Sequence, residues 1–392
     1  MYSLAAFGRM ITDRIRTDAY AEALRREIKT GDVVADIGTG TGILALLACR
    51  FGARRVYAFE PSGVVELARE IAAANGFSDR IQFISQKSTE SALPEPANLI
   101  VSDLRGILPF FDQSLASLID ARKRFLAPGG RMIPQRDTMW IAGVQAPELY
   151  RDSLGPWNDR PYDFDMSAGC ERTSNTISQC LLKNADQLCL EARCLATLDY
   201  ERLAQTDLEA TISWTAKRTS QIHGMVLWFD SVVAEGVGFT NSPGAPPLIY
   251  RQAFFPWSRP LEIVPGDNIT VTVSAKLVGH EYVWRWGATV CAATSDAIQA
   301  GDTKANGTKT QLQQSNFFAA DFSLPELRIS GSSYQPKLNQ NGQVQRRILS
   351  LMEDGTPLEA IAHQLMGDFP GRFRDWRDAF NLVASASRTF GS

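Results

Sequence analysis

The sequence predicts an α/β protein with a doubly wound, Rossmann-like domain, then an all-β, barrel-like domain and a small helical or winged-helix module. Three observations support this prediction. Short apolar strands alternate with helices from residue 33 to about residue 135, as in a parallel sheet with helices on both faces. Strand-like runs between Gly and Pro turns follow, and helical spacing returns after a polar stretch at 332–344. The predicted domains are residues 1–135, 136–331 and 345–392.

The parallel sheet is predicted from the order of its elements. Residues 4–28 have the apolar spacing of two helices, and short apolar runs then alternate with longer amphipathic ones. The ligand crevice of such a sheet lies at the carboxyl ends of its strands. The expected strands are 33–37, 55–59, 81–85 and 98–102, and the expected helices are 42–51, 62–75 and 113–126.

The second and third domains are predicted from a change of pattern after Pro134. Residues 146–175, rich in Pro, Asp and aromatic residues, are expected to form a helix-poor insert. Thr356 is the expected N-cap of a helix that has Pro357 as its first residue. The expected strands are 225–232, 250–256, 268–276 and 282–292, and the expected C-terminal helices are 345–353, 357–366 and 371–388.

Composition excludes several classes of partner. The net charge is -3 without a basic run, so we expect no nucleic acid or anionic membrane as partner. No apolar segment reaches the ~18 residues of a membrane span and the N-terminus lacks a secretion signal, which predicts a cytoplasmic protein. The six cysteines form no C-x-x-C pair and there are only three histidines, so we expect no metal site.

A glycine turn after the first predicted strand indicates the ligand. Asp36 ends that strand, and Ile43 stands where a dinucleotide-binding G-x-G-x-x-G motif has its last glycine. This spacing favours a compact nucleoside with a charged amino-acid tail over a pyrophosphate. The expected cofactor is therefore S-adenosyl-L-methionine, with S-adenosyl-L-homocysteine as product. The turn glycines are Gly38, Gly40 and Gly42.

Further cofactor-binding residues are expected at the same edge of the sheet. Glu60 ends the second strand, about 20 residues after the turn, where a carboxylate can accept hydrogen bonds from both ribose hydroxyls. Pro61 follows it directly. The remaining candidates follow the strands 81–85 and 98–101, and they are Lys87, Ser88, Thr89 and Ser102.

Several motifs, taken together, identify a family. They are Arg16-Thr17-Asp18-Ala19-Tyr20, the turn from Asp36 to Gly42, Glu60, N-G-F-S-D-R-I at 75–81, P-G-G-R-M-I-P at 128–134, Y-D-F-D-M-S at 162–167, His223-Gly224, Trp228-Phe229-Asp230 and Tyr250-Arg251-Gln252. Over roughly residues 2–330 the chain resembles the protein arginine methyltransferases. The resemblance implies that Arg16 holds the cofactor carboxylate and that residues 162–167 belong to a dimerisation arm, so a homodimer is expected.

The loop after the strand 98–101 differs from that family's pattern. The family has two glutamates there, the second nine residues after the first, and this chain has Asp103 and Asp112 at those positions. Arg105 stands where the family usually has a methionine, and Leu248-Ile249-Tyr250 replaces its T-H-W.

Two carboxylates suit methyl transfer to a guanidino nitrogen. Gripping the planar guanidinium would draw positive charge away from the attacking nitrogen, and a carboxylate can later take a proton. Asp103 and Asp112 are thus candidate catalytic residues, although Asp103 would also suit a turn cap and Asp112 a helix start. His223 and Tyr250 are further candidates in the second domain.

Because of Arg105, the sequence does not decide whether the methyl acceptor is cationic or anionic. A fixed cation would repel a guanidinium and bind an anionic substrate, or it would pair with the loop aspartates and orient them. We therefore expect methyl transfer to a guanidino or amine nitrogen of a peptide or small metabolite. The alternatives are an acidic or hydroxylated small molecule, or a non-catalytic binding protein. Residues 345–388 either dock a peptide or partner protein, as similar winged-helix modules bind leader peptides, or cap the β domain.

Overall fold

The computed structural model describes residues 3–293, 307–319, 328–329 and 332–391. The chain divides into two compact units, Met1–Ala320 and Asp321–Ser392. Each unit has its own hydrophobic core. The predicted domain boundary at residue 331 lies outside the described residues.

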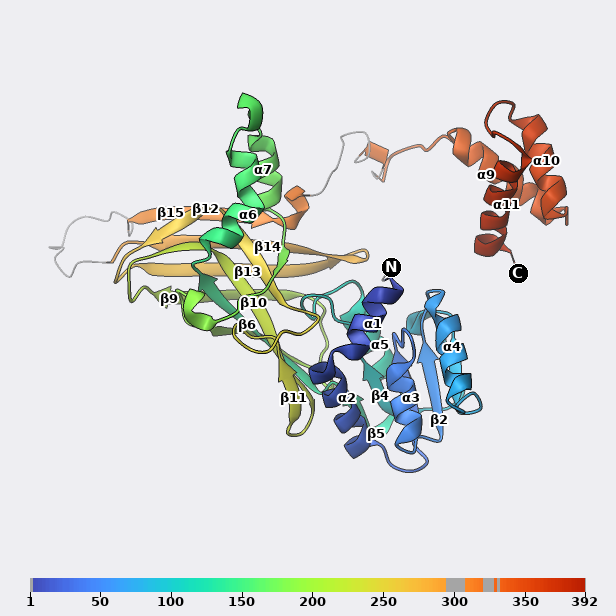
Figure 1. Ribbon diagram of the computed structural model, residues 1–392, viewed down its shortest axis with the longest axis horizontal. Helices are drawn as coiled ribbons and strands as arrows, with labels where there is room; N and C mark the ends of the chain where they lie inside the picture. Colours follow the sequence, from blue (N-terminus) through green and yellow to red (C-terminus); the bar gives the residue numbers. More distant parts are fainter. Residues whose placement is uncertain (1–2, 294–306, 320–327, 330–331, 392) are drawn as a thin grey trace. The chain divides into compact units, whose positions relative to one another are not determined.

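A parallel five-stranded sheet begins the first unit, as predicted (Figure 1). The strand order is β3-β2-β1-β4-β5, so the order reverses between β1 and β4, where ligands bind in doubly wound sheets. All five residues of β1 are buried, as expected for a central strand covered on both faces. The strands are β1 (Val33–Ile37), β2 (Arg55–Phe59), β3 (Ile81–Ile84), β4 (Ala97–Ser102) and β5 (Leu126–Ile133).

Helices surround this sheet and precede it. Asp13 ends the first helix and caps the second, since its side chain accepts a hydrogen bond from the Arg16 N–H. The cap fixes where the second helix begins and therefore where the Arg16 side chain starts. The elements are α1 (Leu4–Thr12), α2 (Arg14–Glu27), α3 (Ile43–Arg50), α4 (Val64–Ala74), α5 (Ser114–Phe125) and the short 3-10 turn η1 (Ser88–Glu90).

Two antiparallel sheets follow, with strand orders β7-β12-β10-β6-β8 and β15-β14-β13-β9, and β11 pairs with β10. The chain passes from the parallel sheet to the first of them between Ile133 and Arg136. Alternating burial along β13 is typical of a sheet with one face in a core. The strands are β6 (Arg136–Val144), β7 (Ser178–Cys180), β8 (Arg193–Asp199), β9 (Leu208–Thr215), β10 (Ser220–Ala234), β11 (Val237–Thr240), β12 (Gln252–Ile263), β13 (Asn268–Val278), β14 (Glu281–Cys291) and β15 (Thr308–Ser315).

The insert at 146–175 is helical, so the prediction that it is helix-poor was wrong. It contains α6 (Pro147–Asn158), α7 (Ser167–Ser174) and the 3-10 turn η2 (Pro161–Asp163), and in Figure 1 α7 projects beyond the sheets. Pro147 lies in the first turn of α6, where a missing N–H costs no hydrogen bond, so proline there starts the helix. Two further 3-10 turns are η3 (Ala185–Gln187) and η4 (Asn316–Ala319).

The second unit contains α9 (Gln340–Glu353), α10 (Leu358–Asp368) and α11 (Trp376–Phe390), and its described residues include no strand. Pro357 is the N-cap of α10, one position later than predicted. The third helix begins at Trp376 and not at 371, because the Asp375 side chain caps it by accepting from the Asp378 N–H. Among the described residues, no helix of the chain is long and apolar enough to cross a membrane.

Candidate active site

A cleft of about 1180 Å³ lies at the carboxyl ends of the parallel strands. The glycine turn and Glu60 form one side, the loop from Asp103 to Asp112 lies in the middle, and Tyr250 with Tyr282 of β14 forms the other side. The loop reaches this place because Ser102, the last residue of β4, pairs with Ile37 at the end of β1. One continuous cavity therefore connects the predicted cofactor edge with the antiparallel sheets.

The glycine turn requires glycine at two of its positions. Gly38 and Gly40 have φ angles of 76° and 54°, in the left-handed region that other residues rarely adopt. A Cβ at Gly38 would collide with the side chain of Leu104. Glu60 holds the turn from the neighbouring strand, because its Oε2 accepts from the Gly40 N–H at 3.1 Å and its Oε1 from the Ser62 N–H at 2.9 Å.

Asp36 is fully buried under this turn. The Thr39 hydroxyl donates to its Oδ2 at 2.6 Å, and its Oδ1 has no hydrogen-bond partner among the described residues. Burial raises the pKa of Asp36 to about 7, and the Thr39 hydrogen bond offsets only part of that effect. Asp36, predicted to bind the cofactor, is therefore covered by the turn and does not line the cleft.

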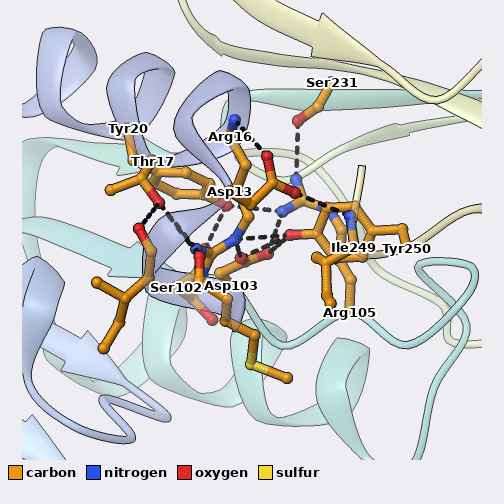
Figure 2. A network of polar contacts seen from close by, with 12 residues as sticks. Asp13, Arg16, Thr17, Tyr20, Ser102, Asp103, Arg105, Ser231, Ile249 and Tyr250 are labelled. Carbon is orange, nitrogen blue, oxygen red and sulfur yellow. Dashed lines mark hydrogen bonds and ion pairs between the residues drawn. The ribbon is translucent and has the colours of Figure 1, made fainter. Parts of the chain in front are cut away.

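Three side chains converge on the Asp103 carboxylate, as Figure 2 shows. Arg16 Nε donates to Oδ2, Arg105 Nη1 donates to Oδ1 at 2.7 Å, and the Tyr250 hydroxyl lies 2.6 Å from both oxygens. Burial alone would raise the pKa of Asp103, but the charges of Arg16 and Arg105 outweigh it and lower that pKa. Asp103 is therefore a buried, ionised carboxylate between two guanidinium groups.

Arg105 uses every donor it has inside the protein. Nε and Nη2 donate to the two carboxylate oxygens of Asp137 on β6, at 2.7 and 2.8 Å. Nη2 also donates to Ser231 Oγ at 2.8 Å, and Nη1 donates to the Tyr20 hydroxyl at 2.6 Å as well as to Asp103. A guanidinium carries five N–H donors, so none is left, and only 3% of this side chain is exposed.

Asp112 lies at the same cleft as Asp103 but differs from it in exposure and in hydrogen bonding. It is exposed, lines the cleft and has a φ angle of 45°, unusual for a residue other than glycine. Its Oδ1 accepts from the Gln113 N–H at 2.8 Å, the geometry of a residue just before α5. The structure thus brings both loop aspartates to one cleft, but only Asp112 opens into solvent.

Of the other predicted site residues, Arg16, Pro61 and Tyr250 line the cleft, and six more do not. His223 on β10 is buried against the Tyr150 ring of α6, and burial lowers its pKa. Ser102 Oγ donates to the Ile37 carbonyl, so this side chain is part of the sheet. The remaining four lie outside the lining of the cleft, and they are Gly42, Lys87, Ser88 and Thr89.

Sequence reasoning missed four residues of the network: Asp13, Asp137, Tyr200 and Ser231. Asp137 left one signal, an acidic residue near the start of an apolar strand. The Tyr200 hydroxyl donates to Asp137 Oδ2 at 2.7 Å from a turn 63 residues away. Asp13 Oδ2 accepts from the Ile249 N–H at 2.8 Å, which ties the start of α2 to the loop that carries Tyr250.

Two family models match consecutive parts of the chain. Residues 15–134 match the Ribosomal protein L11 methyltransferase (PrmA) model, and residues 135–280 match the Arginine methyltransferase oligomerization subdomain. Protein arginine N-methyltransferase 1.1 of Arabidopsis thaliana is 31% identical over 278 residues, covering 68% of this chain and 70% of the plant protein. Protein arginine N-methyltransferase 1 of Saccharomyces cerevisiae is 28% identical over 66% of this chain and 77% of the yeast protein.

Solved structures share the fold. The Trypanosoma brucei PRMT1 enzyme-prozyme heterotetrameric complex with AdoHcy matches with a TM-score of 0.67 and 22% identity, over 79% of this chain and 97% of that one. Arabidopsis thaliana protein arginine methyltransferase 10 matches with a TM-score of 0.67 and 21% identity, over 80% and 98%. The predicted family and the predicted Rossmann-like and antiparallel β domains are confirmed, and the winged-helix form of the C-terminal module stays a prediction. The chain belongs to the protein arginine N-methyltransferase family of S-adenosylmethionine-dependent methyltransferases.

Proposed function

We propose that this enzyme methylates a guanidino nitrogen of arginine in a peptide or protein, with S-adenosyl-L-methionine as methyl donor. The observation that carries the proposal is the single cleft, which holds the glycine turn, Glu60, the two loop aspartates and Tyr250 together. The related plant and yeast proteins are named as protein arginine N-methyltransferases, which favours a peptidyl acceptor over a free metabolite.

The residues of the cleft fit this cofactor. Glu60 lines the cleft at the end of β2, where a carboxylate suits ribose hydroxyls, and the glycine turn lets a nucleoside approach the backbone closely. Arg16 is a buried cation at the same cleft, suited to the carboxylate of the amino-acid tail. When bound, the cofactor supplies a methyl group on a positively charged sulfur.

On the acceptor side, Asp112 would bind the guanidinium. An ionised carboxylate holds the guanidinium by charge-assisted hydrogen bonds and orients one nitrogen toward the donor, so positioning supplies much of the rate. After the new N–C bond forms, the nitrogen carries an extra proton, which the same carboxylate can accept and release to solvent.

An anionic acceptor is not favoured. That alternative required Arg105 to face the substrate. All five of its N–H donors are instead used by other side chains, and only 7% of the residue is exposed. The remaining alternative, a non-catalytic binding protein, lacks support from the family that the chain belongs to.

We also propose that α6 and α7 form the arm of a homodimer. Tyr162 and Phe164, at the tip between the two helices, are 92% and 67% exposed, which leaves two large aromatic side chains in solvent. The family model over this region describes an oligomerization subdomain. The docking of a peptide or partner by the C-terminal unit stays a prediction.

Mass spectrometry of peptides tests the function. The full-length enzyme is incubated with isotopically labelled S-adenosyl-L-methionine and a peptide containing arginine, and with the same peptide carrying lysine in its place. We expect label on the arginine peptide alone, and less label on it at low peptide concentration in the Asp112→Asn variant. Label on neither peptide, or on the lysine peptide, would contradict the proposal.

A further inference from the structure

We propose that Arg105 keeps Asp103 away from the acceptor by closing an ion network around it, which leaves Asp112 as the loop carboxylate that contacts the acceptor. Arg105 is then a positioning residue, and its substitution should allow Asp103 as well as Asp112 to contact the acceptor. This inference rests on the proposed function, since it concerns how that same acceptor is held.

The first step is the occupancy of Asp103. An ionised carboxylate offers about four lone-pair sites, and three donors already occupy three of them, namely Arg16 Nε, Arg105 Nη1 and the Tyr250 hydroxyl. A bidentate grip on a guanidinium needs a free site on each oxygen. Because only 6% of the Asp103 side chain is exposed, an acceptor would have to displace one of these groups.

The second step is the rigidity of Arg105. Its bidentate ion pair with Asp137 is buried on both sides, with exposed side-chain fractions of 3% and 0%. The rings of Phe229 and Phe239 lie 5.5 and 5.8 Å from the guanidinium carbon, so the group is also enclosed by aromatic faces. Arg105, in the loop after β4, is therefore anchored to Asp137 of β6, and from this fixed position it holds Asp103 in place.

The third step is the contrast with Asp112, nine residues further along the same loop. It lines the cleft and is exposed, and its Oδ2 has no hydrogen-bond partner among the described residues. Its left-handed backbone is one that Asp and Asn tolerate better than most residues. The Asp112→Asn variant thus removes the charge and keeps the backbone geometry.

Two matched substitutions of the loop aspartates, Asp103→Asn and Asp112→Asn, separate the two roles. Calorimetric titration with S-adenosyl-L-homocysteine measures the cofactor side, and steady-state kinetics measures the acceptor side. For Asp112→Asn we expect an acceptor KM about tenfold higher, with product affinity and melting temperature unchanged. For Asp103→Asn we expect product affinity to fall about tenfold and the melting temperature to fall, because Arg16 and Arg105 lose their shared anion.

A charge-balanced double variant, Arg105→Met with Asp137→Asn, tests Arg105 directly. It removes one cation and one anion together, so no unpaired charge stays buried. Releasing Asp103 from Arg105 frees one of its lone-pair sites toward the cleft. We expect the acceptor KM to fall about threefold while the affinity for S-adenosyl-L-homocysteine stays unchanged, a split that a merely structural role would not produce.

The inference is overturned if Asp103→Asn raises the acceptor KM with unchanged product affinity, as expected for Asp112→Asn. It is also overturned if the double variant folds and its acceptor KM rises or stays the same. If the wild-type enzyme methylates no arginine peptide, the proposed function fails, while the titrations of the two single variants still decide what Asp103 does.

Discussion

At the scale of single residues, neighbouring charges decide whether a buried carboxylate near this cleft is ionised. Asp103 is enclosed by two guanidinium groups and a hydroxyl, and its pKa is lowered by those charges despite its burial. Asp36 is also buried, but the side-chain hydrogen bond that it accepts comes from the neutral Thr39 hydroxyl and not from a cation. Burial therefore raises its pKa to about 7. The same residue type is therefore ionised in one place and near its titration point in the other.

This difference predicts how stability depends on pH. The pKa of Asp36 is about 7 in the folded chain and near its ordinary 3.8 in the unfolded chain. Between these values the unfolded state has lost a proton that the folded state keeps, so the free energy of unfolding falls as pH rises, by at most about 1.4 kcal/mol per pH unit. Above pH 7 this contribution stays constant.

The Asp36→Asn variant removes that titration. Urea unfolding of both proteins from pH 5 to pH 7 should show a fall in stability that is larger in the wild type, by up to about 3 kcal/mol. Other groups titrate equally in both proteins and cancel in the comparison. Parallel pH profiles would show that Asp36 keeps an ordinary pKa.

At the scale of elements, the backbone conformation of the glycine turn between β1 and α3 is expected to be required for cofactor binding. Gly38→Ala places a Cβ against Leu104 at a φ angle of 76°, while Gly76→Ala has nearly the same φ of 74° and no heavy atom within 4 Å. Both variants should lose about 1–2 kcal/mol of stability through backbone strain. Only Gly38→Ala should lose binding of S-adenosyl-L-homocysteine, measured by calorimetry. Equal affinities in the two variants would separate this turn from the cofactor.

The arm formed by α6 and α7 gives a second expectation at this scale. Replacing Tyr162 and Phe164 by serine removes the exposed aromatic surface without touching a buried side chain. Analytical ultracentrifugation should find a dimer in the wild type and a monomer in the double variant, with the same melting temperature extrapolated to low concentration. A dimer that survives the change would place the contact elsewhere.

Elements set by local pattern were predictable from the sequence, and contacts between distant segments were not. The parallel strands and the glycine turn follow from apolar runs and from the φ angles that glycine allows. Arg105 was recognised as unusual, but its partners Asp137 and Ser231 lie 32 and 126 residues away, on strands whose register no local pattern fixes. His223 was placed in the site by a motif, although its strand turns it against Tyr150.

At the scale of the whole molecule, the site is built from every part of the first unit. Its network takes Arg16 from α2, Asp103 and Arg105 from the loop after β4, Asp137 from β6 and Tyr250 from the loop before β12. The parallel and antiparallel sheets share one hydrophobic core around it. Removal of either sheet would leave buried charges without partners, so these sheets are expected to unfold together.

The C-terminal unit has a hydrophobic core of its own. Its helices pack on their own apolar cluster, centred on Ile348, Ile361 and Val383, and the division between the two units falls at Ala320 and Asp321. A chain ending at residue 331 should therefore melt within about 2 °C of the corresponding transition of the full chain and bind S-adenosyl-L-homocysteine with the same affinity. S-adenosyl-L-homocysteine at about 100 times its Kd should stabilise the first unit by about 2.7 kcal/mol in either chain. The shorter chain should unfold in a single transition. If shortening the chain weakened that binding, the last three helices would have to contribute to the cleft, and a role limited to docking would no longer explain them.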